Sequence, residues 1–531
     1  MLRLFTALSL LLALFAGITP ADSPRRPVNL SQSRQSAAAT QITSFAELKA
    51  LAAATAKNEF QPRAEPPTAL SQMSYEQYRD IQYRPEKAVW WKDGLPFWLE
   101  TFHRGFVQRD RVSLYTNEKG VSHEVPFSSR NFLYRTPIAE KVVRDSGHAG
   151  IKIAGRFPGQ GDGQEMLTFL GSSYFRGRSA DTVYGASARG LAVDIALNRD
   201  EEFPFFKSFW VQRPKPDDEQ LSILALMDSR SVSGAYQFTL TPGTTETTVD
   251  VKCSLYFRSL PEKIGVAPLT SMWMWGDGLM GPPLDNRPAV HDSDGLLIQT
   301  ENDGWTWRAF ARQSYPSVSQ FRVDKLAGFG VLQRNRAFYH FDDHNAQYHN
   351  RPSVWVRPKR GWENGVVELL ELPGAHEGID NIGVYWIPDQ KPTLDTPLDL
   401  DYQVSFFPGD RSDQTEVARA TYFDVQRQDG LIAMDIRFAG DVMARRSDGT
   451  VDVDVTTVRG EVISASADRT DTGDWIAHVL LRPTEDAPVE LGVTLVDAST
   501  DAKQKLSERF VYLCPATEPT FEYPQVYTRK E

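Results

Sequence analysis

The sequence predicts an all-β protein in which a large antiparallel β-sandwich is followed by a smaller β-sandwich. From about residue 90 onward the pattern is strand-like, as in residues 221–227, 235–240 and 247–258, with Gly, Pro, Asp and Asn turns between the strands. No regular alternation of strands with helices appears, which argues against a parallel sheet. The number of strands therefore indicates a large antiparallel sandwich.

The N-terminus predicts export. Arg3 precedes an apolar run, residues 4–18, which is too short to span a bilayer comfortably, and small residues at cleavage-site spacing end at Ala21. We therefore expect a signal peptide over residues 1–21, with an uncleaved membrane anchor as the alternative. Residues 22–43 are rich in Ser, Gln, Ala and Pro without an apolar period, which predicts a disordered lead-in.

The large domain is expected over residues 44–390 and begins with helix signals. Ser44 and Glu47 form a capping-box pattern that predicts a helix through about Lys57. Ser74 and Gln77 form the same pattern and predict a second, shorter helix.

A Pro-containing connector near residue 390 introduces residues 391–531, the expected C-terminal domain. Short alternating strands recur there, for example around residues 434–438, 451–455, 475–481, 491–495 and 509–513. About seven short strands in so short a segment are typical of an immunoglobulin-like sandwich.

Composition excludes some classes of function. The net charge is −11 with acidic and basic residues interspersed, so no basic nucleic-acid footprint is present, and a polyanionic ligand is disfavoured. The two cysteines are Cys253 and Cys514. Cys253 shares the apolar face of an alternating segment, which predicts a buried free thiol rather than a disulfide.

Two acidic pairs stand at loop–strand junctions. Glu377 and Asp380 occupy a Gly-containing loop before the apolar residues 381–387, and Asp292 and Asp294 precede the apolar residues 295–298. Glycoside hydrolysis needs one carboxylic acid and a second carboxylate. Partial burial before a strand would raise the pKa of Asp380 and suit it as the acid. The alternative is that these are turn-forming aspartates.

Aromatic and histidine residues gather between the two pairs. Seven of the twelve tryptophans fall between residues 273 and 386, in and around this part of the chain: Trp273, Trp275, Trp305, Trp307, Trp355, Trp362 and Trp386. Aromatic faces stack on pyranose rings, although a sandwich core uses tryptophan as well. His340, His344, His349 and His376 raise the possibility of a metal site, but no helical HExxH pattern occurs. We predict no metal and no cofactor.

Seven motifs occur in order along the large domain. They are residues 97–106, 170–176, 184–191, 202–204 with 209–210, 287–295, 351–358 and 377–382. Together they resemble the osmoregulated periplasmic glucan biosynthesis proteins, types G and D. The resemblance covers roughly residues 44–400, and the C-terminal domain matches mainly in size and strand pattern.

The resemblance implies a galactose-mutarotase-like large sandwich, an immunoglobulin-like domain and a periplasmic role in making or trimming β-1,2-glucan. Some relatives are similar to inverting β-1,2-glucanases, and others to transglycosylases. The general acid falls on Asp380. The base falls on Asp292, acting through a chain of waters and substrate hydroxyls.

The remaining site residues are expected to bind the sugar chain. Glu377 matches the companion carboxylate of the acid's motif, and Tyr348 and Arg351 match positions that line the cleft. We also expect Trp355, Asp294 and His291 to contact substrate. Two departures stand out: no twin arginine precedes the apolar run, which favours type G, and residues 410–417 do not align.

We therefore expect an exported β-1,2-glucanase or a related transglycosylase. The alternative is a non-catalytic glucan-binding scaffold that hands polymer to the membrane glucan synthase. A homodimer is expected only because the family suggests one.

Overall fold

The computed structural model describes residues 41–62, 65–144, 146–374, 376–411, 414, 416–447, 449–499 and 503–521. The predicted signal peptide, residues 1–21, and most of the predicted lead-in, residues 22–43, lie outside these residues. None of the helices in the described ranges is both long and apolar enough to cross a bilayer.

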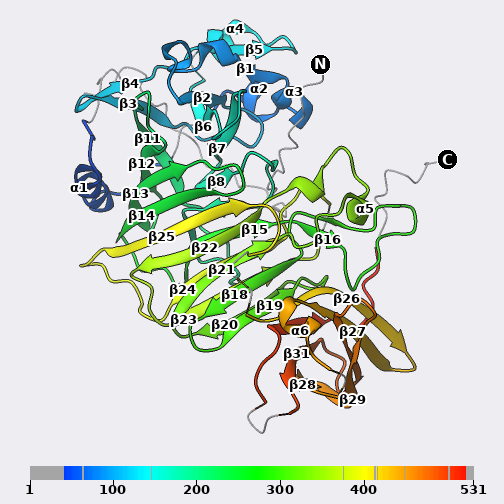
Figure 1. Cartoon of the computed structure of the whole chain (residues 1–531). Helices are drawn as coiled ribbons and strands as arrows, with labels where there is room; N and C mark the ends of the chain where they lie inside the picture. Colours follow the sequence, from blue (N-terminus) through cyan, green and yellow to red (C-terminus); the bar gives the residue numbers. More distant parts are fainter. Residues whose placement is uncertain are drawn as a thin grey trace, which may run out of the picture.

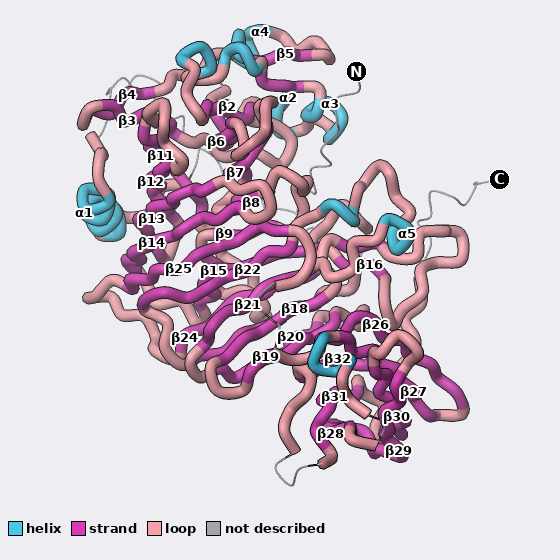
Figure 2. Tube along the Cα trace, in the orientation of Figure 1, coloured by secondary structure: helices cyan, strands magenta, loops and turns pink. Residues whose placement is uncertain are grey.

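Two large sheets build most of the described molecule (Figures 1 and 2). The larger has fourteen described strands, in spatial order β28 (Val451–Val458), β31 (Val489–Asp497), β32 (Arg509–Cys514), β19 (Gly304–Ala309), β18 (Gly295–Thr300), β21 (Leu326–Leu332), β22 (Ser353–Arg360), β25 (Leu398–Phe407), β14 (Thr247–Phe257), β13 (Val232–Thr241), β12 (Leu221–Asp228), β11 (Phe205–Gln212), β3 (Ser113–Glu118) and β4 (Val121–Glu124). The second has ten described strands, β2 (Phe97–His103), β6 (His148–Gly155), β7 (Gln164–Leu170), β8 (Tyr174–Gly177), β9 (Ser187–Arg189), β15 (Ile264–Ser271), β24 (Ile382–Pro388), β23 (Gly365–Glu371) and β20 (Ser317–Val323), with β10 (Leu191–Val193) paired to β15. The predicted all-β class is confirmed.

The two sheets pack face to face over one apolar core. Alternate residues of β13 and β14 point into it, as do alternate residues of β6 and β24, because side chains along a strand alternate between its two faces. Phe169 of β7 contacts Phe209 of β11 and Phe238 of β13, with ring centroids 5.2 and 5.0 Å away. Cys253 lies in this core as a buried free thiol, as predicted.

The helices lie at the periphery and are short apart from the first. They are α1 (Phe45–Ala56), α2 (Thr68–Ser71), α3 (Tyr75–Arg79), α4 (Glu140–Val143), α5 (Phe338–Phe341) and α6 (Asp441–Ala444), with 3₁₀ turns at Pro85–Lys87, Trp91–Asp93, Ser129–Asn131 and Tyr348–Asn350. Both capping boxes are formed: Ser44 accepts from Glu47 N, and Ser74 accepts from Gln77 N. Helix α1 covers the outer face of β12–β14, whereas α2–α4 gather with the short pair β1 (Ile81–Tyr83) and β5 (Phe132–Tyr134) at one end (Figure 1).

The C-terminal seven strands form the predicted immunoglobulin-like sandwich. One layer has the order β26 (Arg419–Gln428), β27 (Leu431–Ala439), β30 (Trp475–Pro483), β29 (Gly460–Arg469), and the other is β28-β31-β32. Numbered A to G along the chain, these layers are ABED and CFG, the arrangement of immunoglobulin constant domains. We call this unit the C-terminal sandwich.

The C-terminal sandwich is joined to the large domain through its backbone. Strand β32 pairs in parallel with β19, so the CFG layer continues into the fourteen-stranded sheet. A second core, shared by Trp307 and Trp355 of the large domain and Phe423 and Phe510 of the C-terminal sandwich, fills this junction. Strand β25, which follows the expected boundary at residue 390, lies between β14 and β22 in the large sheet. The chain enters the C-terminal sandwich at Arg419.

Candidate functional site

Asp380 and Asp292 flank the same stretch of backbone at the end of β15. Thr270, the penultimate residue of β15, donates from Oγ1 to Asp380 Oδ2 at 2.8 Å. Two residues further on, Met272 O accepts from Asp292 N at 2.8 Å. The chain then forms β16 (Trp273–Trp275), which pairs with β17 (Val290–His291) directly before Asp292. Residues about 90 apart in sequence are thus brought to one strand end.

Asp380 is held by its neighbour Asn381. Trp273 N donates to Asn381 Oδ1 at 2.8 Å, and Asn381 Nδ2 donates to Trp273 O at 2.9 Å. This reciprocal pair locks the start of β24 against β16. Asp380 is 8% exposed, so its carboxyl reaches the surface only slightly.

Asp292 is fully buried and paired with Arg351. Its Oδ1 accepts from Arg351 Nη1, while Asp292 Oδ2 has no hydrogen-bond partner among the described residues. Burial raises the pKa of the Asp292 carboxyl because the charged form loses its hydration. The guanidinium of Arg351 opposes that shift, and the nearby charge of Asp380 adds to it, so the net direction of the pKa is upward.

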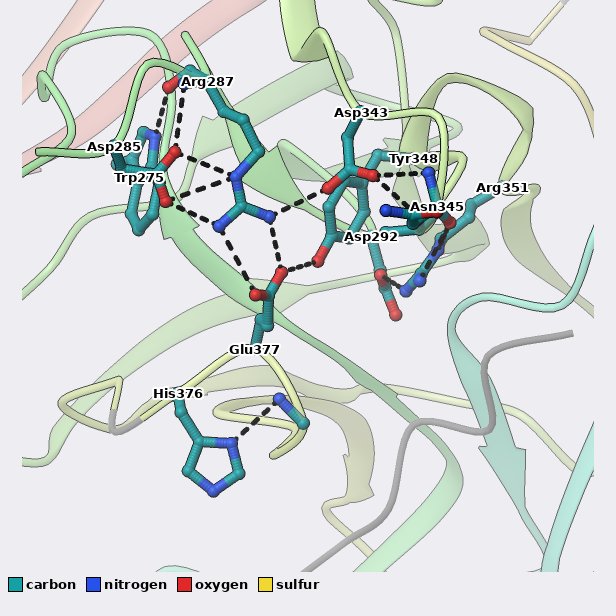
Figure 3. Close-up of polar contacts among 12 residues, drawn as sticks. Trp275, Asp285, Arg287, Asp292, Asp343, Asn345, Tyr348, Arg351, His376 and Glu377 are labelled. Carbon is teal, nitrogen blue, oxygen red and sulfur yellow. Dashed lines mark hydrogen bonds and ion pairs between the residues drawn. The ribbon is translucent and has the colours of Figure 1, made fainter. Parts of the chain in front are cut away.

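Glu377 belongs to a group of charged side chains around Arg287. We call this group, formed by Arg287, Glu377, Asp343 and Asp285, the Glu377 arm. Arg287 donates to Glu377 Oε2 at 2.8 Å, to Asp343 Oδ2 at 2.9 Å and to Asp285 Oδ2 at 2.6 Å (Figure 3). Three carboxylates around one guanidinium leave an acidic excess. The Glu377 side chain is 45% exposed, so it is the member of this arm that faces solvent.

Tyr348 connects this arm to Asp292. Its hydroxyl donates to Glu377 Oε2 at 2.5 Å, and the Arg351 guanidinium lies over its ring, 4.4 Å from the centroid. Burial raises the pKa of Tyr348 far above its usual range, so the phenol stays protonated and acts as a donor. Figure 3 shows the resulting line from Arg287 through Glu377 and Tyr348 to Arg351 and Asp292.

His291 lies beside Asp292 but is fully buried. Its Nδ1 is 2.8 Å from Gln333 Oε1, and its ring is 5.0 Å from that of Phe341. Burial lowers the pKa of His291 to about 3, with a smaller contribution from His340, so the imidazole is neutral at physiological pH. The His291 ring therefore packs behind Asp292 and does not face solvent.

The structure places Asp294 and Trp355 away from this group. Asp294 accepts from Arg334 N at 3.1 Å and lines a hollow of about 20 Å³ against Phe423 of the C-terminal sandwich. Trp355 is 1% exposed, and its ring packs near Trp305 in the junction core. These partners differ from those of Asp292 and Asp380, and contact of Asp294 and Trp355 with substrate stays a prediction.

Several residues of the site were not predicted. Ser187 pairs with Thr270 across β9 and β15 and accepts from Arg176 Nε at 2.5 Å, so Arg176 lies near the strand end that carries Thr270. Arg287 is the hub of the Glu377 arm. Both arginines lie inside recognisable motifs, residues 170–176 and 287–295, but nothing in a linear pattern assigns them these partners.

The site's chemistry is that of carboxylates, arginines and a tyrosine. Within the described ranges, no group of three or more His, Cys, Asp or Glu side chains is arranged to hold a metal ion. A hollow of about 620 Å³ lies elsewhere, between β20 and the C-terminal sandwich, and none of the predicted site residues lines it.

Fold and site together define a class: a two-sandwich all-β protein with paired buried carboxylates at a strand end. The family model described as "Periplasmic glucan biosynthesis protein, MdoG" matches residues 43–514. The chain belongs to this family of periplasmic glucan biosynthesis proteins.

A curated relative agrees. The chain is 37% identical over 464 residues to Glucans biosynthesis protein G of Ralstonia nicotianae (strain ATCC BAA-1114 / GMI1000), a match that covers 85% of this chain and 91% of the relative.

Solved structures give only distant likenesses. The alpha-galactosidase from Lactobacillus brevis matches with a TM-score of 0.24 and 8% identity, over 49% of this chain and 38% of that one. The GH36 alpha-galactosidase AgaB from Geobacillus stearothermophilus matches with a TM-score of 0.22 and 8% identity, over 48% and 38%. TM-scores this low do not establish a shared fold or function.

Proposed function

We propose that this protein acts in the periplasm on β-1,2-glucan as an inverting endo-glucanase. Asp380 is the general acid and Asp292 the base. The observation that supports this assignment best is the convergence of the two carboxylates on one strand end, with Asp380 close enough for its charge to raise the pKa of Asp292. Two carboxylates in different environments are what glycoside hydrolysis requires.

Asp380 is suited to donate a proton to the leaving oxygen. Thr270 Oγ1 donates a hydrogen bond to Oδ2 of Asp380, so Oδ1 is the oxygen that would carry the proton toward the substrate. The Asn381 pair fixes the backbone on which the acid is mounted, and a general acid must be held in a narrow range of positions to work.

Asp292 accepts the proton from the attacking water at a distance. Its side chain is fully buried, so it cannot contact a water in an open cleft directly. A relay of ordered waters and substrate hydroxyls would end at Oδ2, the oxygen without a partner among the described residues. The raised pKa makes Asp292 a stronger proton acceptor than an ordinary aspartate.

Glu377, Tyr348 and Arg351 hold the sugar chain beside the two acids. Glu377 is the exposed end of the Glu377 arm and can accept from glucose hydroxyls. Tyr348 and Arg351 act from beneath, since both are buried and keep Glu377 and Asp292 in fixed positions.

Full burial of Asp292 also favours a second candidate, a glucan-binding scaffold without catalysis. In that case the pair with Arg351 is a structural ion pair, and the cleft presents polymer to the membrane glucan synthase. A transglycosylase uses the same residues with a sugar hydroxyl in place of water. A homodimer remains a prediction.

Product analysis decides among these. Purified protein is incubated with linear β-1,2-glucan, and chain lengths, reducing ends and anomeric configuration are followed by chromatography and NMR. New reducing ends with inverted configuration support the proposal. Redistributed chain lengths without a gain in reducing ends indicate transglycosylation, and unchanged polymer that still binds indicates a scaffold.

A further inference from the structure

The segment after the last strand returns from the C-terminal sandwich to the large domain. Arg427 of β26 holds its start, donating to Pro515 O and, at 3.4 Å, to Ala516 O. Gln313 of the large domain donates to Leu513 O at 2.8 Å. Residues 515–517 then form part of the wall of the 620 Å³ hollow beside β20. The segment is therefore attached on both sides of the domain junction.

Phe521 is the last described residue of this segment, and it packs beside the candidate site. The Phe521 ring meets Trp275 edge-on, with centroids 5.6 Å apart and an interplanar angle of 86°. The Arg312 guanidinium covers the same ring, 4.5 Å from its centroid. The edge-to-face aromatic pair and the cation–π contact both favour one position of the ring.

Trp275 is in turn the support of Arg287. Its Nε1 donates to Arg287 O at 3.0 Å, and the Arg287 guanidinium lies 5.7 Å from the indole centroid. The backbone of Gly281 approaches the indole so closely that a Cβ there would fall 2.6 Å from Nε1. Trp275 thus has little freedom to move unless Phe521 leaves.

The ion pair between Arg287 and Glu377 does not by itself fix the position of the exposed Glu377 side chain. Glu377 is nearly half exposed, and an ion pair with a solvent-exposed partner contributes little to stability because water screens it. Arg287 also has Asp285 and Asp343 as competing partners. Trp275, against which Phe521 packs, contacts both the backbone and the guanidinium of Arg287.

We propose that Phe521 is a positioning residue through which the C-terminal sandwich controls the Glu377 arm. It acts on substrate only through Trp275, Arg287 and Glu377. The kinetic part of this inference rests on the proposed function, whereas the structural part, order in the Glu377 loop, does not.

The direct test is Phe521→Ala in the full chain. We expect a melting temperature close to that of the wild type and a loss in kcat/KM on β-1,2-glucan of about tenfold, because small misplacements of positioning groups cost factors of this size. Phe521→Tyr keeps the ring and should restore most of the activity. Tyr315→Ala removes an exposed aromatic side chain from the hollow that residues 515–517 line, and it should behave as wild type.

A double-mutant cycle separates positioning from general loosening. If Phe521 works through Glu377, then Phe521→Ala combined with Glu377→Gln loses no more activity than Glu377→Gln alone. Fully additive losses would overturn the proposal. If Phe521→Ala unfolds, Phe521→Leu keeps the apolar bulk and carries the same cycle.

Hydrogen exchange gives a readout that does not depend on activity. Phe521→Ala should speed amide exchange in residues 376–379 at least severalfold while leaving β13 and β14 unchanged. Unaltered exchange in that loop would refute the positioning role. A protein that fails to cleave or bind glucan but still shows this change would refute the proposed function and keep the positioning role.

Discussion

Asp292 and Asp294 stand two residues apart, yet they serve different regions of the molecule. Asp292 points toward Arg351 and Asp380 at the end of β15, whereas Asp294 points into the junction with the C-terminal sandwich, where Arg334 and Asn335 amides bind it. In a regular strand, residues i and i+2 share a face. Here β17 ends at His291 and β18 begins at Gly295, so the bend between them sends the two carboxylates apart.

Burial raises the pKa of the carboxylate in both environments, but the partners differ. Asp292 pairs with Arg351 and lies close enough to Asp380 for the charge of Asp380 to raise its pKa further. Burial raises the pKa of Asp294 to about 7, and the same cause raises the pKa of its neighbour Asp277 to about 8. Burial therefore favours the protonated forms of Asp294 and Asp277 near neutral pH, whereas Asp292 and Asp380 are the residues proposed for proton transfer.

The sharpest test of this contrast is Asp380→Asn. Removing the proposed general acid should lower hydrolysis on the order of 10³-fold, while the melting temperature changes little because the amide can still accept from Thr270. Reducing-end assays on β-1,2-glucan measure the loss. The matched control is Asp277→Asn, the same chemical change at the junction, which should keep turnover within about threefold of wild type. Near-normal turnover in Asp380→Asn would eliminate it as the acid.

Next in size is Arg351→Ala. This change strips the buried Asp292 of its cation, and breaking a buried pair typically costs about 3–5 kcal/mol of unfolding free energy. Urea denaturation at pH 7 measures it. The loss should shrink in Arg351→Ala with Asp292→Asn, since the uncompensated charge is then gone. A single variant as stable as the wild type would mean that the pair is not needed in the fold.

The stability of the protein should depend on pH because of Asp277 in the junction. The folded pKa of Asp277, about 8, lies above its ordinary value of 3.8, so between these values the folded protein holds a proton that the unfolded chain releases. Stability from this group is thus full below about pH 4 and declines as pH rises toward 8. Asp277→Asn should stabilise the protein by on the order of 1–3 kcal/mol at pH 8 and by almost nothing at pH 4. Thermal melts across this range provide the measurement, and an equal shift at both ends would contradict the assignment.

The smallest effect on function is expected for Trp355→Phe. Because the indole lies in the junction core, the change should cost about 1–2 kcal/mol of stability and leave the Kd for β-1,2-gluco-oligosaccharides within about twofold. Calorimetric binding of β-1,2-gluco-oligosaccharides provides the check. A large rise in Kd would indicate that Trp355 contacts the glucan.

Local signals predicted the local structure well. The capping boxes at Ser44 and Ser74, the apolar face that carries Cys253 and the seven strands of the C-terminal sandwich all follow from short-range patterns, and all are present. Patterns of this kind do not specify which distant strands pair. The parallel contact of β19 with β32 joins residues about 200 apart in sequence, and tertiary packing alone decides it.

The candidate site could likewise be predicted only in part. Sequence motifs pointed to Asp292, Asp380, Glu377, Tyr348 and Arg351, which the structure brings together in one region. They could not separate Asp294 from Asp292, because the bend that parts them follows from the pairing of β17 with β16. Nor could they reveal Arg287 as a hub, since its three acidic partners come from three different loops.

The pairing of β32 with β19 also limits how the molecule can be cut. A fragment that stops before the C-terminal sandwich would leave β19 as a bare sheet edge, with Trp305 and Trp307 on it and backbone amides open to any passing chain. Exposed apolar edges of this kind invite self-association. The large domain expressed by itself should accordingly aggregate, and co-expression with the missing segment should rescue its solubility.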